Sequence, residues 1–592
     1  MKRHKTASKP QQLLQMVAVL ALSFLAGFCD AAVVTWDGGG TGGQMGYGWR
    51  WAYGDEANWD TDAQPGPDDE AVFPDAMVRT AITLAGDFTI RKLTYANQTP
   101  LKLGGAGTNT ITTTDIEVRN SDNAPSTNSV PWLQLGGNGL WSVGACKELQ
   151  IGGGIRNDGQ GHALTKTGPG LVRCTLYANN SYTGKTVVAE GTLRLEGYNT
   201  QLKSPEVVVG DGVHAAMLDI AHENNAHLNM LGAPKHAVVT INTNAVYKIR
   251  ETPATTTFYP ETYAIHGGTL DIGGNAIYLS NDASTPWERS VTMTGGVITN
   301  GLLGFTLPSS SGHTGLAIRA SARTATIAAD LAFGGERYSF HIEDGASPVD
   351  LEVTGRIRGN FGFTKTGPGT LALSCPTGGD MRRERKPIIV GGGALLMDGG
   401  ILPVSGSNSV NVVAGGTLGG TGAICSLDTT FITAHVTLEG EDGNPAVLAP
   451  GTVDRATGEW LCGTLRVGTS DVTNNVAFIN HGTLRVKLDR GGEASCLAVV
   501  GAVSLASSLD SDALDIIAPL AHVPSGEHVL VTFSNLLTGR FDTVTLNGEP
   551  LPDSCALEYR NAENAVVTGT DAIAGGSIVL VVPPQESVVI IQ

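Results

Sequence analysis

The chain has 592 residues, of which 56 are acidic and 38 are basic, so its formal net charge at pH 7 is −18. An acidic surface repels the phosphate backbone, which argues against nucleic acid as a partner. The same charge favours solubility at a cell surface.

Residues 1–31 have the pattern of a secretion signal. Lys2 and Arg3 open a basic start, residues 13–28 are apolar with few interruptions, and Ala31 offers a small residue for cleavage. We therefore expect export, with removal of this segment; a membrane anchor left in place is the alternative. No other run of about 18 apolar residues occurs, so we expect no membrane span after signal removal.

A stretch dense in tryptophan, glycine and aspartate follows, within an N-terminal region expected over residues 32–100. It contains Trp36, Trp49, Trp51 and Trp59. Aromatic faces at Trp49, Trp51 and Trp59 could bind a glycan by stacking. The reading that we favour is a cap of bulky side chains, which seals the open end of a stacked array.

Residues 163–197 contain the unit around which the chain is organised. Three short runs of β-forming residues, 171–176, 186–189 and 192–195, are separated by glycine and proline. Gly-Pro-Gly at 168–170 predicts a turn, because glycine tolerates positive φ and proline presets φ to about −65°. None of the runs is long enough for a helical face, so the unit predicts three strands joined by turns.

The unit returns at residues 363–399. Both copies carry Thr-Lys-Thr-Gly-Pro-Gly before a β run, with the motif residues Lys166, Gly168, Pro169 and Gly170 in the first copy and Lys365, Gly367, Pro368 and Gly369 in the second. Internal repetition of strand-and-turn units predicts a solenoid or a propeller, in which each unit buries its apolar face only against its neighbours.

The first copy runs Lys-Thr-Gly-Pro-Gly, Asn-Ser-Tyr-Thr-Gly and Glu-Gly-Thr-Leu-Arg-Leu-Glu-Gly. It resembles the autotransporter-associated β-strand repeat of large secreted and surface proteins of Gram-negative-type bacteria. In the second copy Pro-Thr-Gly-Gly and a charged insert at residues 382–386 replace the middle block. The resemblance implies a right-handed parallel β-helix, which we expect over residues 101–474. The Trp-rich stretch also resembles the start of proteins that carry this repeat, which favours the cap.

Near the C-terminus the apolar alternation becomes longer and more regular, for example at residues 528–533 and 577–582. We therefore expect an all-β chain with a separate, β-sandwich-like module over residues 475–592. The residues after Leu505 are too few for an outer-membrane barrel of about 8 or more strands. The chain thus resembles an autotransporter passenger without its translocator.

Candidate catalytic acids are scattered at Asp219, Asp271, Asp344 and Asp350, and the sequence places no two of them at a separation suited to glycoside chemistry. Gly-x-Ser-x-Gly, Cys-x-x-Cys and His-Glu-x-x-His motifs are absent, so we predict no catalytic, cofactor-binding or metal-binding residues. Consecutive acids at residues 68–70 predict a solvated turn rather than a calcium site. Most cysteines are expected to be apolar core residues, with one or two disulfides left open.

Two functions from different classes follow. The first is a non-enzymatic structural or adhesin-like protein, secreted or at the cell surface, whose partners are extracellular glycans or cell-surface proteins. The alternative is a polysaccharide-binding or polysaccharide-degrading protein that uses a lateral groove. Strand positions filled by Val, Leu, Ile and Thr, rather than by converging carboxylates, favour the first function, and fold-level analogy to enzymes does not decide between them.

Overall fold

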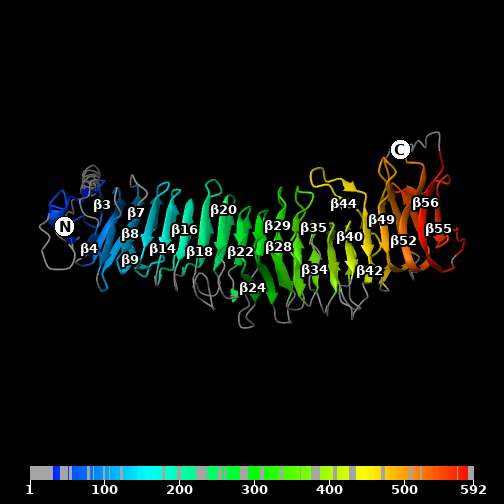
Figure 1. Ribbon diagram of the computed structural model, residues 1–592, viewed down its shortest axis with the longest axis horizontal. Coiled ribbons are helices and arrows are strands. Elements are labelled where there is room, and N and C mark those ends of the chain that lie inside the picture. The colour runs from blue at the N-terminus through cyan, green and yellow to red at the C-terminus, as the bar shows by residue number, and fades with distance from the viewer. Residues whose placement is uncertain are drawn as a thin grey trace, which may run out of the picture.

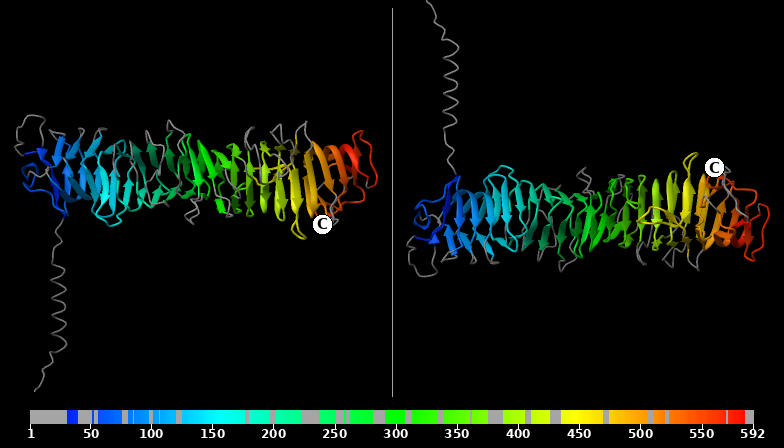
Figure 2. Two further views of the ribbon diagram at one scale, coloured as in Figure 1. Left: turned by 90° about the horizontal axis from the view of Figure 1, so that it is seen from below. Right: turned by 90° about the horizontal axis from the view of Figure 1, so that it is seen from above.

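The computed structural model is a long rod of stacked strands (Figure 1), and two further views show the same elongated outline (Figure 2). The residues that the structure describes are 31–39, 51–52, 56–75, 81–84, 86–97, 101–105, 107–119, 125–175, 180–196, 202–221, 237–250, 257–258, 262–280, 291–306, 313–333, 338–359, 362–374, 387–404, 410–425, 435–468, 474–505, 511–519, 523–569 and 571–584. Within these ranges the one helical element is a 3-10 turn, η1 (Glu56–Asn58), which confirms the predicted all-β fold.

One sheet, here called face 1, runs the length of the rod, and each strand pairs in parallel with the next. Its strands are β1 (Val33–Thr35), β3 (Glu70–Phe73), β5 (Phe88–Tyr95), β7 (Thr110–Val118), β10 (Gly139–Val143), β13 (Leu164–Thr167), β15 (Thr186–Val188), β17 (Glu206–Val209), β19 (Val238–Asn242), β22 (Thr262–His266), β25 (Val291–Met293), β28 (His313–Ile318), β31 (Tyr338–Ile342), β34 (Phe363–Thr366), β36 (Ile388–Val390), β39 (Val410–Val413), β42 (His435–Glu439), β47 (Asn474–Asn480), β50 (Gly501–Leu505) and β52 (Gly526–Gly539).

A second parallel sheet, face 2, follows face 1 turn by turn. Its strands are β2 (Trp51–Ala52), β4 (Ala81–Leu84), β6 (Lys102–Gly105), β8 (Ser126–Ser129), β11 (Glu148–Ile151), β14 (Leu171–Cys174), β16 (Gly191–Glu196), β18 (Ala216–Ala221), β20 (Ala245–Ile249), β23 (Thr269–Asp271), β26 (Val297–Thr299), β29 (Ala325–Ile327), β32 (Leu351–Val353), β35 (Thr370–Leu373), β37 (Gly393–Met397), β40 (Gly416–Gly420), β43 (Ala446–Pro450), β48 (Gly482–Lys487), β51 (Ala513–Ile517) and β53 (Thr543–Leu546).

Shorter third strands complete some turns, also in parallel. They are β9 (Trp132–Leu135), β12 (Gly154–Asn157), β21 (Thr257–Phe258), β24 (Ala276–Ser280), β27 (Leu302–Thr306), β30 (Asp330–Phe333), β33 (Ile357–Gly359), β38 (Ile401–Pro403), β41 (Ala423–Cys425), β46 (Thr464–Val467) and β49 (Cys496–Val499). Because each turn passes from face 1 to face 2 and back, the chain winds as a parallel β-helix, and this part of the prediction is confirmed.

The interior is filled by columns of apolar side chains, one from each turn. On face 1 the paired residues of one such column, each at most 1% exposed, are Val188, Val209, Ile241, Ile265, Met293, Ile318 and Ile342. Side chains of a strand alternate between its two sides, so every second residue enters the core and its neighbours point outward. A turn therefore buries its apolar side chains only by stacking on the next turn.

The N-terminal end is closed by an aromatic cluster. Trp59 is fully buried, and its ring meets that of Trp36 edge-on with centroids 5.1 Å apart. Phe73 and then Tyr95 continue the cluster into the first turns. This packing supports a cap, as large aromatic side chains cover apolar area that the first turn would otherwise expose.

At the C-terminal end the parallel stack continues beyond residue 475, where we expected a separate module to begin. β51 pairs in parallel with β48 and then with β53. The pairing changes only near the end, where β55 (Ala556–Asn561) and β56 (Ile573–Val582) pair antiparallel and β56 lies antiparallel to β52. The expected boundary at 475 therefore does not coincide with a change in strand pairing.

Among the described residues, two antiparallel hairpins contain strands of only two residues. β54 (Glu549–Pro550) returns antiparallel to β53. β44 (Thr452–Val453) and β45 (Trp460–Leu461) form the other, which extends from the side of the rod (Figure 1). Trp460 and Val453 of this hairpin cover a small apolar cluster on the outside of face 2, formed by Val349, Ala372 and Leu396.

Candidate functional site

The repeat motif forms the corner between face 1 and face 2, and its lysine is buried there. Lys166 donates hydrogen bonds to the backbone oxygens of Thr167 at 3.0 Å and of Gly168 within its own corner. It donates a third, 2.9 Å long, to the backbone oxygen of Glu190 in the next turn. Burial lowers the pKa of Lys166 to about 8, and the charge of Glu190 opposes this shift. The lysine thus ties two successive corners together.

The second copy repeats this arrangement. Lys365 is fully buried and donates hydrogen bonds to the backbone oxygens of Gly367 at 2.7 Å and of Gly392, in the next turn, at 2.6 Å. Burial lowers its pKa to about 8 as well, against the charges of Asp350 and Asp344. The sequence identified both lysines as motif residues but did not show that they act on backbone carbonyls.

The motif glycines are required by the corner itself. Gly168 and Gly367 have φ of 74° and 81°, in the region that only glycine adopts freely. A Cβ at Gly168 would lie 2.5 Å from the backbone oxygen of Val143 in the preceding turn. The predicted turns at Gly-Pro-Gly are therefore present, with Pro169 and Pro368 between the paired glycines, and the whole motif has a structural role.

Of the three tryptophans considered as glycan contacts, the structure describes the side chain of Trp59 alone. Trp59 is in the core, so it presents no ring face to a ligand. Trp51 begins β2, but its side chain, like the whole of Trp49, lies outside the described residues. Among the three, only Trp59 can be interpreted, and it favours the cap.

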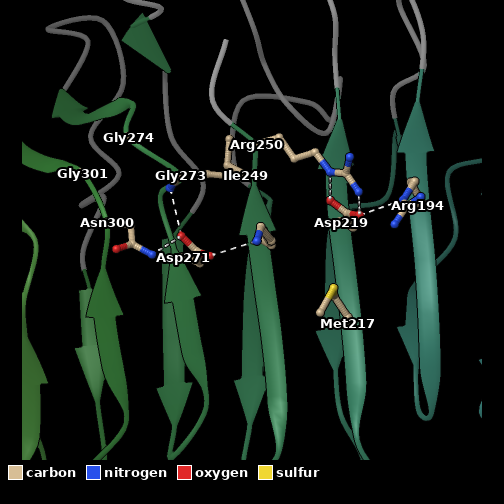
Figure 3. Close-up of a pocket in the computed structure, with 11 residues that line it drawn as sticks. Arg194, Met217, Asp219, Ile249, Arg250, Asp271, Gly273, Gly274, Asn300 and Gly301 are labelled. Atoms are coloured by element: carbon tan, nitrogen blue, oxygen red, sulfur yellow. Dashed lines mark hydrogen bonds and ion pairs between the residues drawn. The ribbon is translucent and has the colours of Figure 1, made fainter.

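A charged groove of about 920 Å³ lies on the outside of face 2, over β16 to β26. It brings together two of the four candidate acids, Asp219 and Asp271 (Figure 3). Asp219 is buried between two arginines: Arg194 donates from Nε at 2.7 Å, and Arg250 donates from Nε at 3.0 Å and from a terminal nitrogen at 2.8 Å. Burial by itself would raise the pKa of Asp219, but these bonds outweigh it and hold the pKa below its ordinary value.

Asp271 is held by different partners. It accepts hydrogen bonds from the backbone nitrogen of Gly273 at 3.0 Å and from the side-chain nitrogen of Asn300 at 3.1 Å. The ammonium of Lys248 lies 3.6 Å from its other oxygen. Strand pairing aligns Arg194 with Asp219, Asp219 with Lys248, and Lys248 with Asp271, so the charges alternate along the rod.

The groove exposes its cations and covers its carboxylates. The side chains of Asp219 and Asp271 are 1% and 13% exposed, whereas those of Lys248 and Arg250 are 42% and 44% exposed. Three basic side chains, including Arg194, thus lie around two acidic ones. Although the whole chain is acidic, this part of its surface presents positive charge to solvent.

The other two candidate acids lie elsewhere, at the corner before β32. Asp350 is buried, and burial raises its pKa. Its carboxylate accepts hydrogen bonds from the backbone nitrogens of Gly345 and Thr370, both at 2.8 Å. The bond from Thr370 links this corner to the next turn. The charge of Asp344 acts on it from nearby. Asp350 therefore stabilises the corner near Lys365, and neither acid lines the groove.

The described residues contain no group of three or more His, Cys, Asp or Glu that could hold a metal ion. The six cysteines among them are free. Cys174 and Cys425 are buried, but Cys462, Cys496 and Cys555 are partly buried and Cys146 is exposed, so the prediction that most cysteines are core residues is wrong for this part of the chain. Among the described residues, no helix is long and apolar enough to cross a membrane.

No family model and no curated protein matches this sequence.

Proposed function

We propose that this chain is a non-enzymatic, adhesin-like rod that is exported and either secreted or displayed at the cell surface. The observation that carries this proposal is the state of Asp219, the most buried acid of the groove. Two arginines hold its pKa low, so it cannot supply a proton at neutral pH as a glycosidic general acid must. The remaining strands present stacked apolar columns inward, which extend the rod.

A degradation screen tests this function. The purified chain without residues 1–31 is incubated with neutral and acidic polysaccharides, and new reducing ends and unsaturated products are measured. We expect no turnover. Reproducible turnover that Asp219→Asn or Asp271→Asn abolishes would show that the groove is catalytic and would defeat the proposal.

The second candidate is a polysaccharide-binding or polysaccharide-degrading protein. The groove on face 2 favours it, because its polar side chains lie on successive turns along one line. A hydrolase would need a carboxylic acid that donates a proton to the leaving oxygen, and Asp219 and Asp271 are both held as hydrogen-bond acceptors. A lyase would need a base instead, and the degradation screen tests for it through the unsaturated products. Binding without cleavage remains compatible with the adhesin-like proposal.

Export and the resemblance to the autotransporter-associated repeat belong to the same proposal. The basic and apolar pattern of residues 1–31 supports export. The two Lys-Thr-Gly-Pro-Gly corners, with the same buried lysine in each, support an internal repeat. N-terminal sequencing of the exported chain should begin at Ala32 or Val33, and an intact Met1 would contradict removal of the signal.

A further inference from the structure

The groove on face 2 has the chemistry of a receptor for negatively charged groups. We propose that it binds the acidic groups of an anionic polysaccharide, an inference that rests on the adhesin-like function proposed above. An arginine has five N–H donors, and the bonds to Asp219 use one from Arg194 and two from Arg250. The other donors of these arginines, with the half-exposed ammonium of Lys248, can bind carboxylate or sulfate oxygens.

The carboxylates of the groove hold the cations in place. Asp219 fixes the guanidinium groups of Arg194 and Arg250 from beneath, and Asp271 lies beside Lys248. Side chains that are fixed before a ligand arrives lose less conformational entropy when it binds. The two acids therefore act as positioning residues, and the exposed donors above them make the contacts.

The direction of the groove fits a linear ligand. Arg194 pairs with Asp219 on the next strand, and Asp219 pairs with Lys248 on the strand after it. Neighbouring strands are about 4.8 Å apart, so the cations at Arg194 and Lys248 recur at about twice this distance along the rod. A chain that carries acidic groups at intervals can lie along face 2 and meet them in succession.

Other polymers fit the groove less well. Its lining residues, as far as the structure describes them, include no aromatic side chain, so it offers no ring face for a neutral sugar or a nucleobase. The apolar part of the lining is limited to Met217 and Ile249. Recognition by charge at a few positions leaves an anionic polysaccharide as the ligand class.

The test compares binding of the full exported chain to immobilised alginate, which carries carboxylates, and chondroitin sulfate, which also carries sulfates. Neutral dextran and single-stranded DNA are the other probes. We expect binding to at least one of the acidic polysaccharides and a decrease with added salt. The Lys248→Gln, Arg250→Gln double variant should bind at least about tenfold more weakly, because it removes charge-assisted hydrogen bonds.

Matched controls lie outside the groove. Lys185 is also 42% exposed and pairs with Glu206 at 2.6 Å on face 1. Arg485 is 49% exposed and pairs with Asp515 at 2.8 Å, farther along face 2. The Lys185→Gln, Arg485→Gln double variant removes the same charge and should bind as the unaltered chain does. Circular dichroism of both variants must match that of the unaltered chain.

The inference is overturned if neither acidic polysaccharide binds, if dextran or DNA binds as tightly, or if the two double variants are weakened equally. These outcomes leave the proposed non-enzymatic function standing as long as the degradation screen is negative. Cleavage of alginate or chondroitin sulfate would have the opposite meaning, since the groove would then bind as inferred and the non-enzymatic function would fail.

Discussion

Lys166 donates a hydrogen bond from its ammonium group to the backbone oxygen of Glu190, one turn farther along the rod, at 2.9 Å. Lys365 makes the equivalent bond to Gly392. In each case a buried charge is stabilised by carbonyl dipoles of two corners and not by a direct salt bridge. Burial of such a charge costs free energy of folding. Its removal also costs free energy, because the buried backbone oxygens then lose their hydrogen-bond donor.

Substitution of Lys166 by Met should destabilise the chain. The change keeps a long side chain but leaves the oxygens of Thr167, Gly168 and Glu190 without this donor, which we expect to cost about 2–3 kcal/mol. Urea unfolding measures the loss. The control is Lys185→Met at a side chain that is 42% exposed, where we expect a change below about 0.5 kcal/mol. Equal losses in the two variants would contradict the bridging role.

The same lysines make stability depend on pH. Burial lowers the pKa of Lys166 from its ordinary 10.5 to about 8. Below about pH 8 the lysine is charged in both the folded and the unfolded chain, so its contribution is constant. Between about pH 8 and 10.5 the unfolded chain binds more protons, so the free energy of unfolding rises with pH.

The measurement is the urea midpoint at pH 7 and pH 9.5 for the unaltered chain and for Lys166→Met, Lys365→Met. We expect the difference between the two chains to grow in favour of the unaltered chain as the pH rises. A difference that stays constant or shrinks over this interval would contradict a lowered pKa, because lysines that keep their protons in the fold contribute no rise in stability with pH.

Glycine at the corner of the following turn should be intolerant of a side chain. Gly191 has φ of 69°, and a Cβ there would lie 2.4 Å from the backbone oxygen of Gly168. Gly212 has φ of 86° but has nothing within 4 Å of its Cβ position. Gly191→Ala should therefore reduce the free energy of unfolding by about 1–3 kcal/mol more than Gly212→Ala does. The larger loss is measured as a lower thermal midpoint. A similar effect of both would mean that backbone strain alone matters.

The strands and corners could be predicted from the sequence because they depend on local features. Gly-Pro-Gly at 168–170 specifies a turn whatever surrounds it, and alternating β-branched residues specify a strand with one buried side. The role of Lys166 could not be predicted, because its partner Glu190 is a neighbour only after the turns have stacked. The signal that was available is the return of the same lysine, at Lys365, before the second Gly-Pro-Gly.

The groove could not be predicted from the sequence, for a related reason. Asp219 and Asp271 were both noted as acids, but the lengths of the turns between them vary, so their alignment with Lys248 depends on the strand register. The continuation of the parallel stack past residue 475 was missed because longer strands such as β52 resemble those of an antiparallel sheet until their pairing is known.

Substitution of Asp219 by Asn should leave Arg194 and Arg250 without their shared carboxylate. We expect a loss of about 1–3 kcal/mol, limited by the partial exposure of Arg250. Asp515→Asn should cost less, because Asp515 pairs with one arginine, Arg485, and otherwise accepts a hydrogen bond from the hydroxyl of Thr545. Because the folded pKa of Asp219 is lowered, its contribution is present above the ordinary value of 3.8 and is lost as the pH falls through the folded pKa. Thermal unfolding at pH 7 and pH 3 measures both effects.

The parallel register between Leu164 and Thr186 makes one winding of the chain a unit of length. Deletion of residues 164–185 would let the flanking windings stack on each other and shorten the rod by about 4.8 Å. The aromatic cluster covers the first winding at one end, and at the other end the parallel stack gives way to the antiparallel β55 and β56. The reach of the rod is therefore set by the number of windings that the polypeptide encodes, and it can be changed in steps of one winding.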